Sequence, residues 1–178
     1  MKFCVRRFNT YFIAGLAILL ACGCQSEAHK RHHAASTFSV FLETASYGTE
    51  QGKSITFPRD EPSTVLIERE PFLTEANVAA AQVVSTMGGF GISIELDRRG
   101  KWLLDEYSTA NHGRRLVIST EFGPDLSKQR WLAAPKITHR MAEGILSFTP
   151  DASREECDQI VLGLNNVAKK VQDVTDKW

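Results

Sequence analysis

Cysteine is scarce in this sequence, and its few occurrences are unevenly placed. Of the four cysteines, Cys4, Cys22 and Cys24 fall within the first 24 residues, and only Cys157 lies further along the chain. This distribution excludes a disulfide within the body of the protein, even in an oxidising compartment. Cys157 stands at the start of an apolar helix face, where a cysteine is most simply a small buried hydrophobe.

An excess of positive charge is also missing. Lysine and arginine together number 21, as do aspartate and glutamate. Three of the basic residues and none of the acidic ones lie in residues 1–23, so the remainder has 18 basic residues against 21 acidic ones. A mildly acidic body without a basic face argues against nucleic acid as a partner. At 178 residues and 43% hydrophobic, the chain is long enough for one domain with a proper core.

The sequence carries no established motif of catalysis, phosphate binding or metal binding. Gly88, Gly89 and Gly91 are not followed by a helix or by the lysine of a phosphate-binding loop, so they indicate a turn. His112 and His139 are the histidines outside the amino-terminal 33 residues, and His112 suits the negative end of a helix dipole. We therefore predict no catalytic residue, no cofactor and no metal, with a hydrolase kept as an alternative.

The first residues have the features of an export signal. Basic residues precede an apolar run at residues 11–21 that is too short to cross a bilayer. The run ends in small residues and two cysteines, which resembles the lipobox of bacterial lipoproteins, where the cysteine receives a lipid and becomes the first mature residue. Cys24 is preceded by small Gly23 and is the preferred lipid attachment site, with Cys22 as the alternative. A plain secretory signal cut nearby also remains open.

This organisation places the protein in the cell envelope. We predict a signal peptide at residues 1–23, a lipidated tether at 24–36 and a single α+β domain at 37–178. The bilayer is then a partner through the amino-terminal acyl chains, and the domain faces the periplasm or the cell exterior. The inner and the outer membrane both remain open.

Hydrophobic periodicity predicts an alternation of strands and two long helices. Strands are expected at residues 37–45, 55–57, 63–70, 79–87, 90–96, 114–120, 131–137 and 144–149. Gly88 and Gly89 indicate a β-hairpin, after which Gly91, Ser93 and Glu95 alternate with an apolar set. Residues 121–130 are expected to form a polar excursion between strands.

Two helices complete the predicted fold. The first is expected at residues 99–112 with Trp102, Leu103 and Tyr107 pointing inward. The second begins at a Ser153–Glu156 capping box and has one apolar face, with apolar positions at 157, 160, 161, 164, 167, 168 and 171. The fold class predicted is α+β, a mainly antiparallel sheet with both long helices packed on one face.

Several short segments resemble the head part of the large periplasmic domain of SecD, an accessory membrane subunit of the bacterial protein-export channel. They are Gly113-Arg114-Arg115-Leu116, Ala133-Ala134-Pro135, Gly144-Ile145 and Phe148-Thr149, within a resemblance over residues 74–169. The resemblance implies an α+β fold of ferredoxin-like character and a module that contacts exported polypeptide or export machinery. The proton-driven activity of SecD is not implied, because its several transmembrane helices have no counterpart after the signal.

The resulting hypothesis is a non-catalytic protein- or peptide-binding module. Arg114 and Arg115 lie on a predicted strand and Trp131 enters the next one, and both residue types are favoured at the centres of contacts. The alternative for Trp131 is that it closes one end of the core, with an arginine covering it. A purely structural envelope lipoprotein remains the second functional hypothesis.

Overall fold

A computed structural model describes residues 33–44, 52–57 and 63–175 of the chain. The chain divides into two units, Met1–His32 and His33–Trp178. The first unit lies outside the described residues, and with it the predicted signal peptide, Cys22, Cys24 and most of the predicted tether. Among the described residues, no helix combines the length and the apolar character needed to cross a bilayer.

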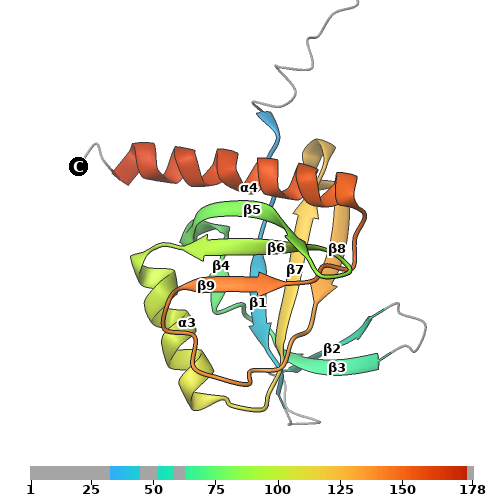
Figure 1. The fold of residues 1–178 in the computed structure, drawn as a ribbon, viewed down its shortest axis with the longest axis vertical. Coiled ribbons are helices and arrows are strands. Elements are labelled where there is room, and N and C mark those ends of the chain that lie inside the picture. Colours follow the sequence, from blue (N-terminus) through green and yellow to red (C-terminus); the bar gives the residue numbers. More distant parts are fainter. Residues whose placement is uncertain (1–32, 45–51, 58–62, 176–178) are drawn as a thin grey trace, which may run out of the picture. The chain divides into compact units, whose positions relative to one another are not determined.

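Three antiparallel sheets form the second unit (Figure 1). The four-stranded sheet has the order β4-β1-β7-β8, from β4 (Leu73–Thr74), β1 (Ser39–Leu42), β7 (Leu116–Phe122) and β8 (Lys128–Ala133). The three-stranded sheet has the order β5-β6-β9, from β5 (Val78–Thr86), β6 (Gly89–Leu96) and β9 (Ile145–Phe148). The two-stranded sheet pairs β2 (Gly52–Phe57) with β3 (Ser63–Glu68).

In the described part of the unit there are also two long helices and two short 3₁₀ turns: α3 (Arg98–Ala110), α4 (Arg154–Thr175), η1 (Glu75–Asn77) and η2 (Pro124–Leu126). Asp97 caps α3 by accepting a hydrogen bond from the backbone N–H of Gly100 at 2.6 Å. The predicted capping box of α4 is confirmed, because Ser153 and Glu156 exchange side-chain to backbone hydrogen bonds of 3.2 Å each.

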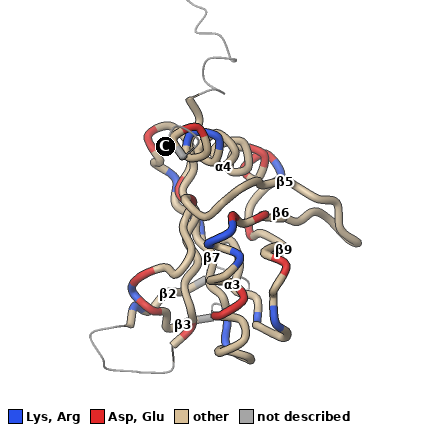
Figure 2. The backbone as a smooth tube through the Cα atoms, turned by 90° about the vertical axis from the view of Figure 1, so that its left-hand side faces the viewer, with Lys and Arg blue, Asp and Glu red and all other residues tan. Residues whose placement is uncertain are grey.

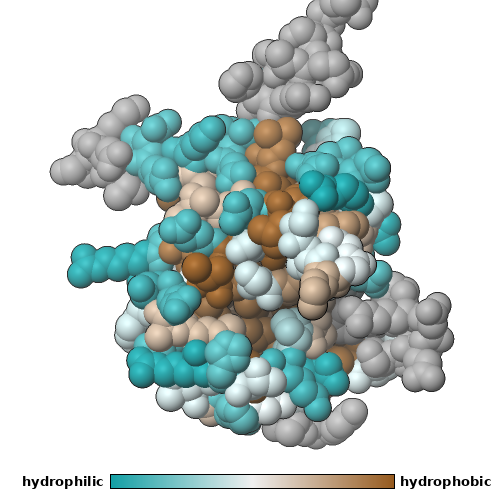
Figure 3. Space-filling model, viewed as in Figure 1, coloured by the Kyte–Doolittle hydropathy of each residue, from teal (hydrophilic) through white to brown (hydrophobic). Residues whose placement is uncertain are grey.

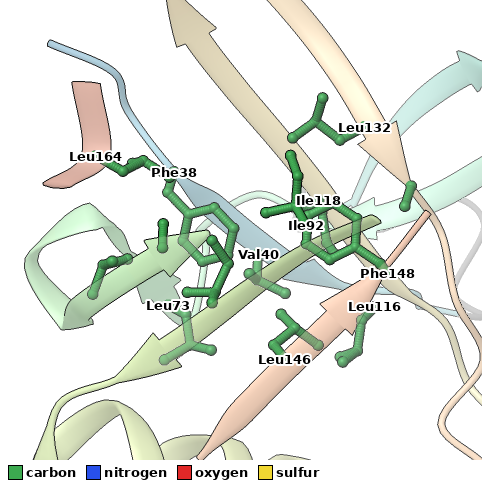
Figure 4. Packing of buried hydrophobic residues seen from close by; sticks show 14 of the residues in the cluster. Phe38, Val40, Leu73, Ile92, Leu116, Ile118, Leu132, Leu146, Phe148 and Leu164 are labelled. Carbon is green, nitrogen blue, oxygen red and sulfur yellow. The ribbon is translucent and has the colours of Figure 1, made fainter. Parts of the chain in front are cut away.

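The main core lies between the four-stranded and three-stranded sheets (Figure 4). Side chains alternate along each strand, so Val40 and Ile118 enter this core from one side, and Ile92 and Phe148 from the other. The residues between them face the opposite way. Val117 packs there in a second, smaller core with the two-stranded sheet.

The prediction of a mainly antiparallel α+β fold is confirmed, but the predicted single sheet with both helices on one face differs from the structure. Strands of the other two sheets pack against both faces of the four-stranded sheet, so the two helices do not form a layer on one face of it. Instead α4 lies along β5, and α3 packs against β4, η1 and β6. Among the described residues, the cores therefore combine three β-layers.

Three details of the sequence prediction are corrected. Trp102 was expected to point inward but is 61% exposed, and α3 buries Gly100, Leu104 and Ser108 instead. Val171 was expected on the apolar face of α4 and is exposed near its end. Residues 121–130 are not a long excursion, since β7 continues to Phe122 and β8 already starts at Lys128 with only η2 between them.

Candidate binding surface

One face of the three-stranded sheet points away from the main core. On this outer face, the Ser147 hydroxyl donates a hydrogen bond of 3.1 Å to the Ser93 hydroxyl on the neighbouring strand. A Cβ added to Gly91 would lie 3.6 Å from Val84 Cγ2 and 3.4 Å from Thr86 Cγ2, so these side chains share that face. The register then gives the members of the outer face as Gln82, Val84, Thr86, Gly91, Ser93, Glu95, Ile145 and Ser147.

The outer face carries little charge and is not covered by any described helix. Residues 78–94 contain no Asp, Glu, Lys or Arg, and the hairpin of β5 and β6 is accordingly tan in Figure 2. In Figure 3, apolar surface gathers as a band from the middle of α4 over β5 to β6 and β9, with hydrophilic residues around it. Ile145 is 47% exposed and Met87, at the hairpin tip, is fully exposed. Apolar surface of this kind, rimmed by polar residues, is typical of contact sites.

One edge of the same sheet is closed by a helix. The Asn165 side chain of α4 accepts a hydrogen bond from Ala81 N at 2.8 Å and donates one to Ala81 O at 2.9 Å. An amide side chain thereby takes the place of a neighbouring strand on the outer edge of β5. Such pairing removes the exposed backbone groups that make a free edge adhesive.

The residues predicted to contact a partner lie on the opposite side of the four-stranded sheet or at its end. Trp131 is half-buried in the second core, with its ring centroid 5.9 Å from that of Phe41. Arg115 is half-buried, and its guanidinium donates to the carbonyl of Ala134 at 3.1 Å. Arg114 is exposed. The structure thus engages Trp131 and Arg115 in the fold itself and leaves Arg114 at the surface, and none of the three lies on the outer face.

The two histidines outside the amino-terminal 33 residues lie where a loop meets the end of α3. His112 Nε2 lies 2.8 Å from the carbonyl oxygen of Thr138, and His139 Nδ1 lies 3.1 Å from the hydroxyl of Thr138. Arg140 Nη2 donates to Asp105 Oδ2 at 2.7 Å, and this hydrogen bond lowers the pKa of the Asp105 carboxyl. His112 and Asp105 thus hold the loop at Thr138 and Arg140 against the end of α3. No group of three His, Cys, Asp or Glu side chains within the described ranges is arranged to hold a metal ion.

The one cysteine of the described region is chemically quiet. Cys157 is fully buried on α4, and burial raises the pKa of its thiol to about 11. A nucleophilic cysteine needs a depressed pKa and an exposed sulfur, and Cys157 has the reverse of both. This agrees with the prediction of a small buried hydrophobe.

Sequence reasoning identified part of the outer face and missed the rest. The alternation after Gly89 set Gly91, Ser93 and Glu95 on one side of a strand, and that side is the outer face. Ile145 and Ser147 come from a strand fifty residues away, so their place beside β6 depends on a strand pairing that no local pattern reveals. Asn165 is not among the apolar positions predicted for its helix, and its structural role depends on the packing of α4 on β5.

The comparisons with known proteins agree on one family. The family model of the SecDF P1 head subdomain matches residues 51–168, which is more than half of the chain. A solved structure described as "Structure and function of a membrane component SecDF that enhances protein export" superposes with a TM-score of 0.56 at 17% identity, over 81% of this chain and 70% of that one. A search of curated proteins gave no match.

A second solved structure, "Crystal structure of SecDF in Super-membrane-facing form", superposes with a TM-score of 0.52 at 17% identity. The superposition covers 79% of this chain but 21% of that one, so this chain spans about a fifth of the length of that protein. At this identity the two structures show a shared fold, and the match over residues 51–168 shows the family. The chain belongs to the SecDF P1 head subdomain family.

Proposed function

We propose that this protein is a membrane-tethered, non-catalytic module of the cell envelope that binds extended polypeptide as an aid to protein export or handling. The observation that carries the proposal is the match to the SecDF P1 head subdomain over residues 51–168. A solved neighbour is described as a membrane component that enhances protein export. This likeness supports a link to export, and we infer that the head-like domain contributes to it by binding.

The outer face supports a binding role on physical grounds. From β5 to β9 it consists mainly of small and apolar residues, including Val84, Gly91 and Ile145, with Glu95 as its one charged member among the described residues. Desolvating such a face costs little, because few charges lose their water. Burying its apolar area against a partner contributes roughly 25 cal/mol per Å².

The tether is the second part of the proposal. Lipidation of Cys24, or alternatively of Cys22, would hold the domain at the bilayer on the envelope side. Two or more acyl chains give stable anchoring, whereas one chain binds only marginally. A tethered binder meets its partners at a raised effective concentration, so even weak contacts on the outer face are occupied.

Site-specific photocrosslinking in cell envelopes tests the binding role. A photoreactive residue at Gln82 on the outer face and one at Arg114, the exposed predicted contact, are compared with one at exposed Lys169 on α4. We expect polypeptide adducts from Gln82 that increase when export is stalled, and few from Lys169. Adducts only to cell-wall material, or none above the Lys169 control, would favour a structural lipoprotein and refute the proposal.

Mass spectrometry of the mature amino terminus tests the tether. We expect a peptide that begins at Cys24 and carries the mass of a diacylglycerol group, and a Cys24→Ser chain that accumulates uncleaved. An unmodified amino terminus on freely soluble material would refute lipid anchoring. Modification of Cys22 instead would keep the tether and move its position by two residues.

A further inference from the structure

We propose that the free edge of β9 is the place where an extended polypeptide adds as an extra strand to the three-stranded sheet. This inference rests on the polypeptide-binding role proposed above and gives it an atomic location. Two observations carry it: the direction in which the backbone groups of β9 point, and the lack of a neighbouring strand on one side of β9 among the described residues.

Hydrogen bonding alternates along an antiparallel strand, so the bonded side of β9 can be derived from one contact. Leu96 N donates to Gly144 O at 2.9 Å, and Ile94 and Ile92 pair with Leu146 and Phe148 two and four residues on. These even-numbered residues therefore direct their backbone groups to β6. The N–H and C=O groups of Ile145 and Ser147 then point to the other side of β9.

That other side has no neighbouring strand among the described elements. The strand order β5-β6-β9 places β9 at the edge, and no backbone hydrogen bond from the described residues reaches Ile145 or Ser147 on the outward side. Both residues are exposed. Two donors and two acceptors thus face solvent in the geometry of a strand that lacks its partner.

The other edges of the two larger sheets are protected. Asn165 closes the edge of β5 with two hydrogen bonds to Ala81. On β8, the Leu132 carbonyl accepts from Asp151 N at 2.7 Å, and the free part of that strand carries two basic residues. β4 has only two residues. Charge, shortness and covering are the usual devices that prevent strand addition, and within the described residues β9 has neither charge nor cover.

The side chains around the edge suit an uncharged, extended guest. Residues 144–150 contain no charged side chain, and Ile145 offers apolar surface beside the free backbone groups. Backbone pairing supplies affinity whatever the guest sequence, while alternate side chains of the guest contact the outer face. This combination suits a binder of unfolded segments with varied sequences.

Charge at the two ends of β9 favours a foreign segment over a second copy of this chain. Glu143 precedes the strand, Glu95 lies beside Ile145, and Asp151 follows the strand. Two β9 strands in antiparallel pairing bring the Glu143 end of one copy to the Asp151 end of the other. Like charges at opposed positions are destabilising, so the edge favours a guest whose flanks are neutral or basic.

The test measures binding of a defined peptide to the full-length chain in detergent micelles. The probe is a ten-residue peptide of alternating valine and threonine with a lysine at each end, and its control is the same peptide methylated at every backbone nitrogen. At saturation we expect amide exchange at Ile145 and Ser147 to slow at least tenfold, while Leu146 and Phe148, already bonded to β6, change little. The methylated peptide should leave all four amides unchanged.

A matched pair of variants locates the site. Ser147→Pro removes one outward N–H, which is tolerated on an edge strand, and should weaken binding at least tenfold. Ser147→Ala loses the side-chain hydrogen bond to Ser93 but keeps that N–H, and should bind as the native chain does. If Ser147→Pro fails to fold, Ser147→Lys places a charge beside the edge and should also weaken binding of the lysine-flanked peptide.

The outcomes separate this inference from the proposed function. Equal affinity of the Pro and Ala variants, or protection that appears on another strand, would overturn the β9 assignment. Self-association of the native chain without peptide, lost in Ser147→Pro, would assign the edge to a second copy and overturn it as well. Polypeptide crosslinks from Gln82 that persist in Ser147→Pro envelopes would keep the proposed function while removing this site from it.

Discussion

Gly163 offers a sharp test of how the domain is held to the segment that precedes it. Residues 34–36 cross α4 at this glycine, where a Cβ would overlap the Ser36 hydroxyl oxygen and lie 2.7 Å from Ala35 C and Ser36 N. Carbon atoms in contact prefer about 3.5–4.0 Å. Two of the three clashes involve backbone, so no side-chain rotation removes them.

The neighbouring contacts prevent the crossing segment from moving aside. Immediately after it, Thr37 N donates to Glu121 O at 2.8 Å, and the Thr120 hydroxyl donates to Thr37 O at 2.7 Å. On the helix side, Asn166 Nδ2 donates to Ala34 O at 3.0 Å. A shift that relieves Gly163→Ala therefore breaks at least one hydrogen bond or bends the helix.

Whether Gly163→Ala stabilises or destabilises the protein follows from the sizes of three opposing contributions. Replacing glycine by alanine within a helix stabilises by about 1 kcal/mol. Overpacking costs about 1–3 kcal/mol, and the lost Asn166 hydrogen bond costs about 1 kcal/mol more. The free energy of unfolding of Gly163→Ala should thus fall by roughly 1–3 kcal/mol. Urea unfolding measures this, and limited proteolysis should show earlier cleavage near residues 33–36.

A second substitution separates the clash from other effects. The buried Ser36 hydroxyl has no hydrogen-bond partner among the described residues, so Ser36→Ala alone should be neutral or stabilising. Ser36→Gly in the Gly163→Ala background removes the side-chain overlap but not the backbone ones, and should recover only part of the loss. A gain in stability in Gly163→Ala, with unchanged proteolysis, would refute this account of the crossing.

Three further predictions concern other parts of the fold. Asn165→Leu leaves Ala81 N and O without partners, so it should lower the free energy of unfolding by about 2 kcal/mol in urea. The freed edge of β5 should also promote association of the chain, which light scattering measures. Gln159→Leu, at an exposed site of the same helix, is the control and should do neither. The backbone hydrogen bond from Ser153, helped by Arg130, lowers the pKa of Glu156. The stabilising contribution of Glu156 is therefore complete above the ordinary pKa of a glutamate and disappears as the pH falls through its lowered pKa in the folded protein. The urea midpoint of Glu156→Gln should then fall less steeply in acid than that of the native chain, and parallel curves would contradict this. A chain shortened to residues 51–178 should show no cooperative unfolding by circular dichroism, whereas one shortened to 33–178 should unfold cooperatively, because only the latter keeps β1.

Features set by neighbouring residues could be predicted from the sequence. The hairpin at Gly88 depends on a turn with φ of +94°, which glycine adopts readily, and the start of α4 depends on Ser153 and Glu156 three residues apart. In both cases the interacting groups lie within one turn of chain. The residue types at these neighbouring positions are therefore enough to predict the contact.

The orientation of α3 could not be predicted, because the closest contact uses small residues. Gly100 packs so closely on Asn77 that a Cβ added to Gly100 would lie only 2.9 Å from the Cβ of Asn77. Further along the helix, the Ser108 hydroxyl accepts a hydrogen bond from Met141 N at 2.9 Å. A prediction that assigns the core face to the largest apolar residues selects Trp102, which the close approach of the helix leaves outside. The pairing of β6 with β9 could not be predicted either, because the two strands lie far apart in the sequence.

The boundary of the family match and the boundary of the fold differ at β1, and this bears on how the domain is connected. The match begins at residue 51, yet β1 lies between β4 and β7 in the four-stranded sheet, with Val40 and Phe38 almost completely buried. A few residues before β1, Ala35 and Ser36 pack closely against Gly163 of α4. Any pull on the chain from its amino-terminal side therefore acts first on the contact with α4, and α4 also closes the β5 edge through Asn165. The three-stranded sheet is thus held by α4 at its β5 edge, and β9, where we propose that polypeptide adds, forms its other edge.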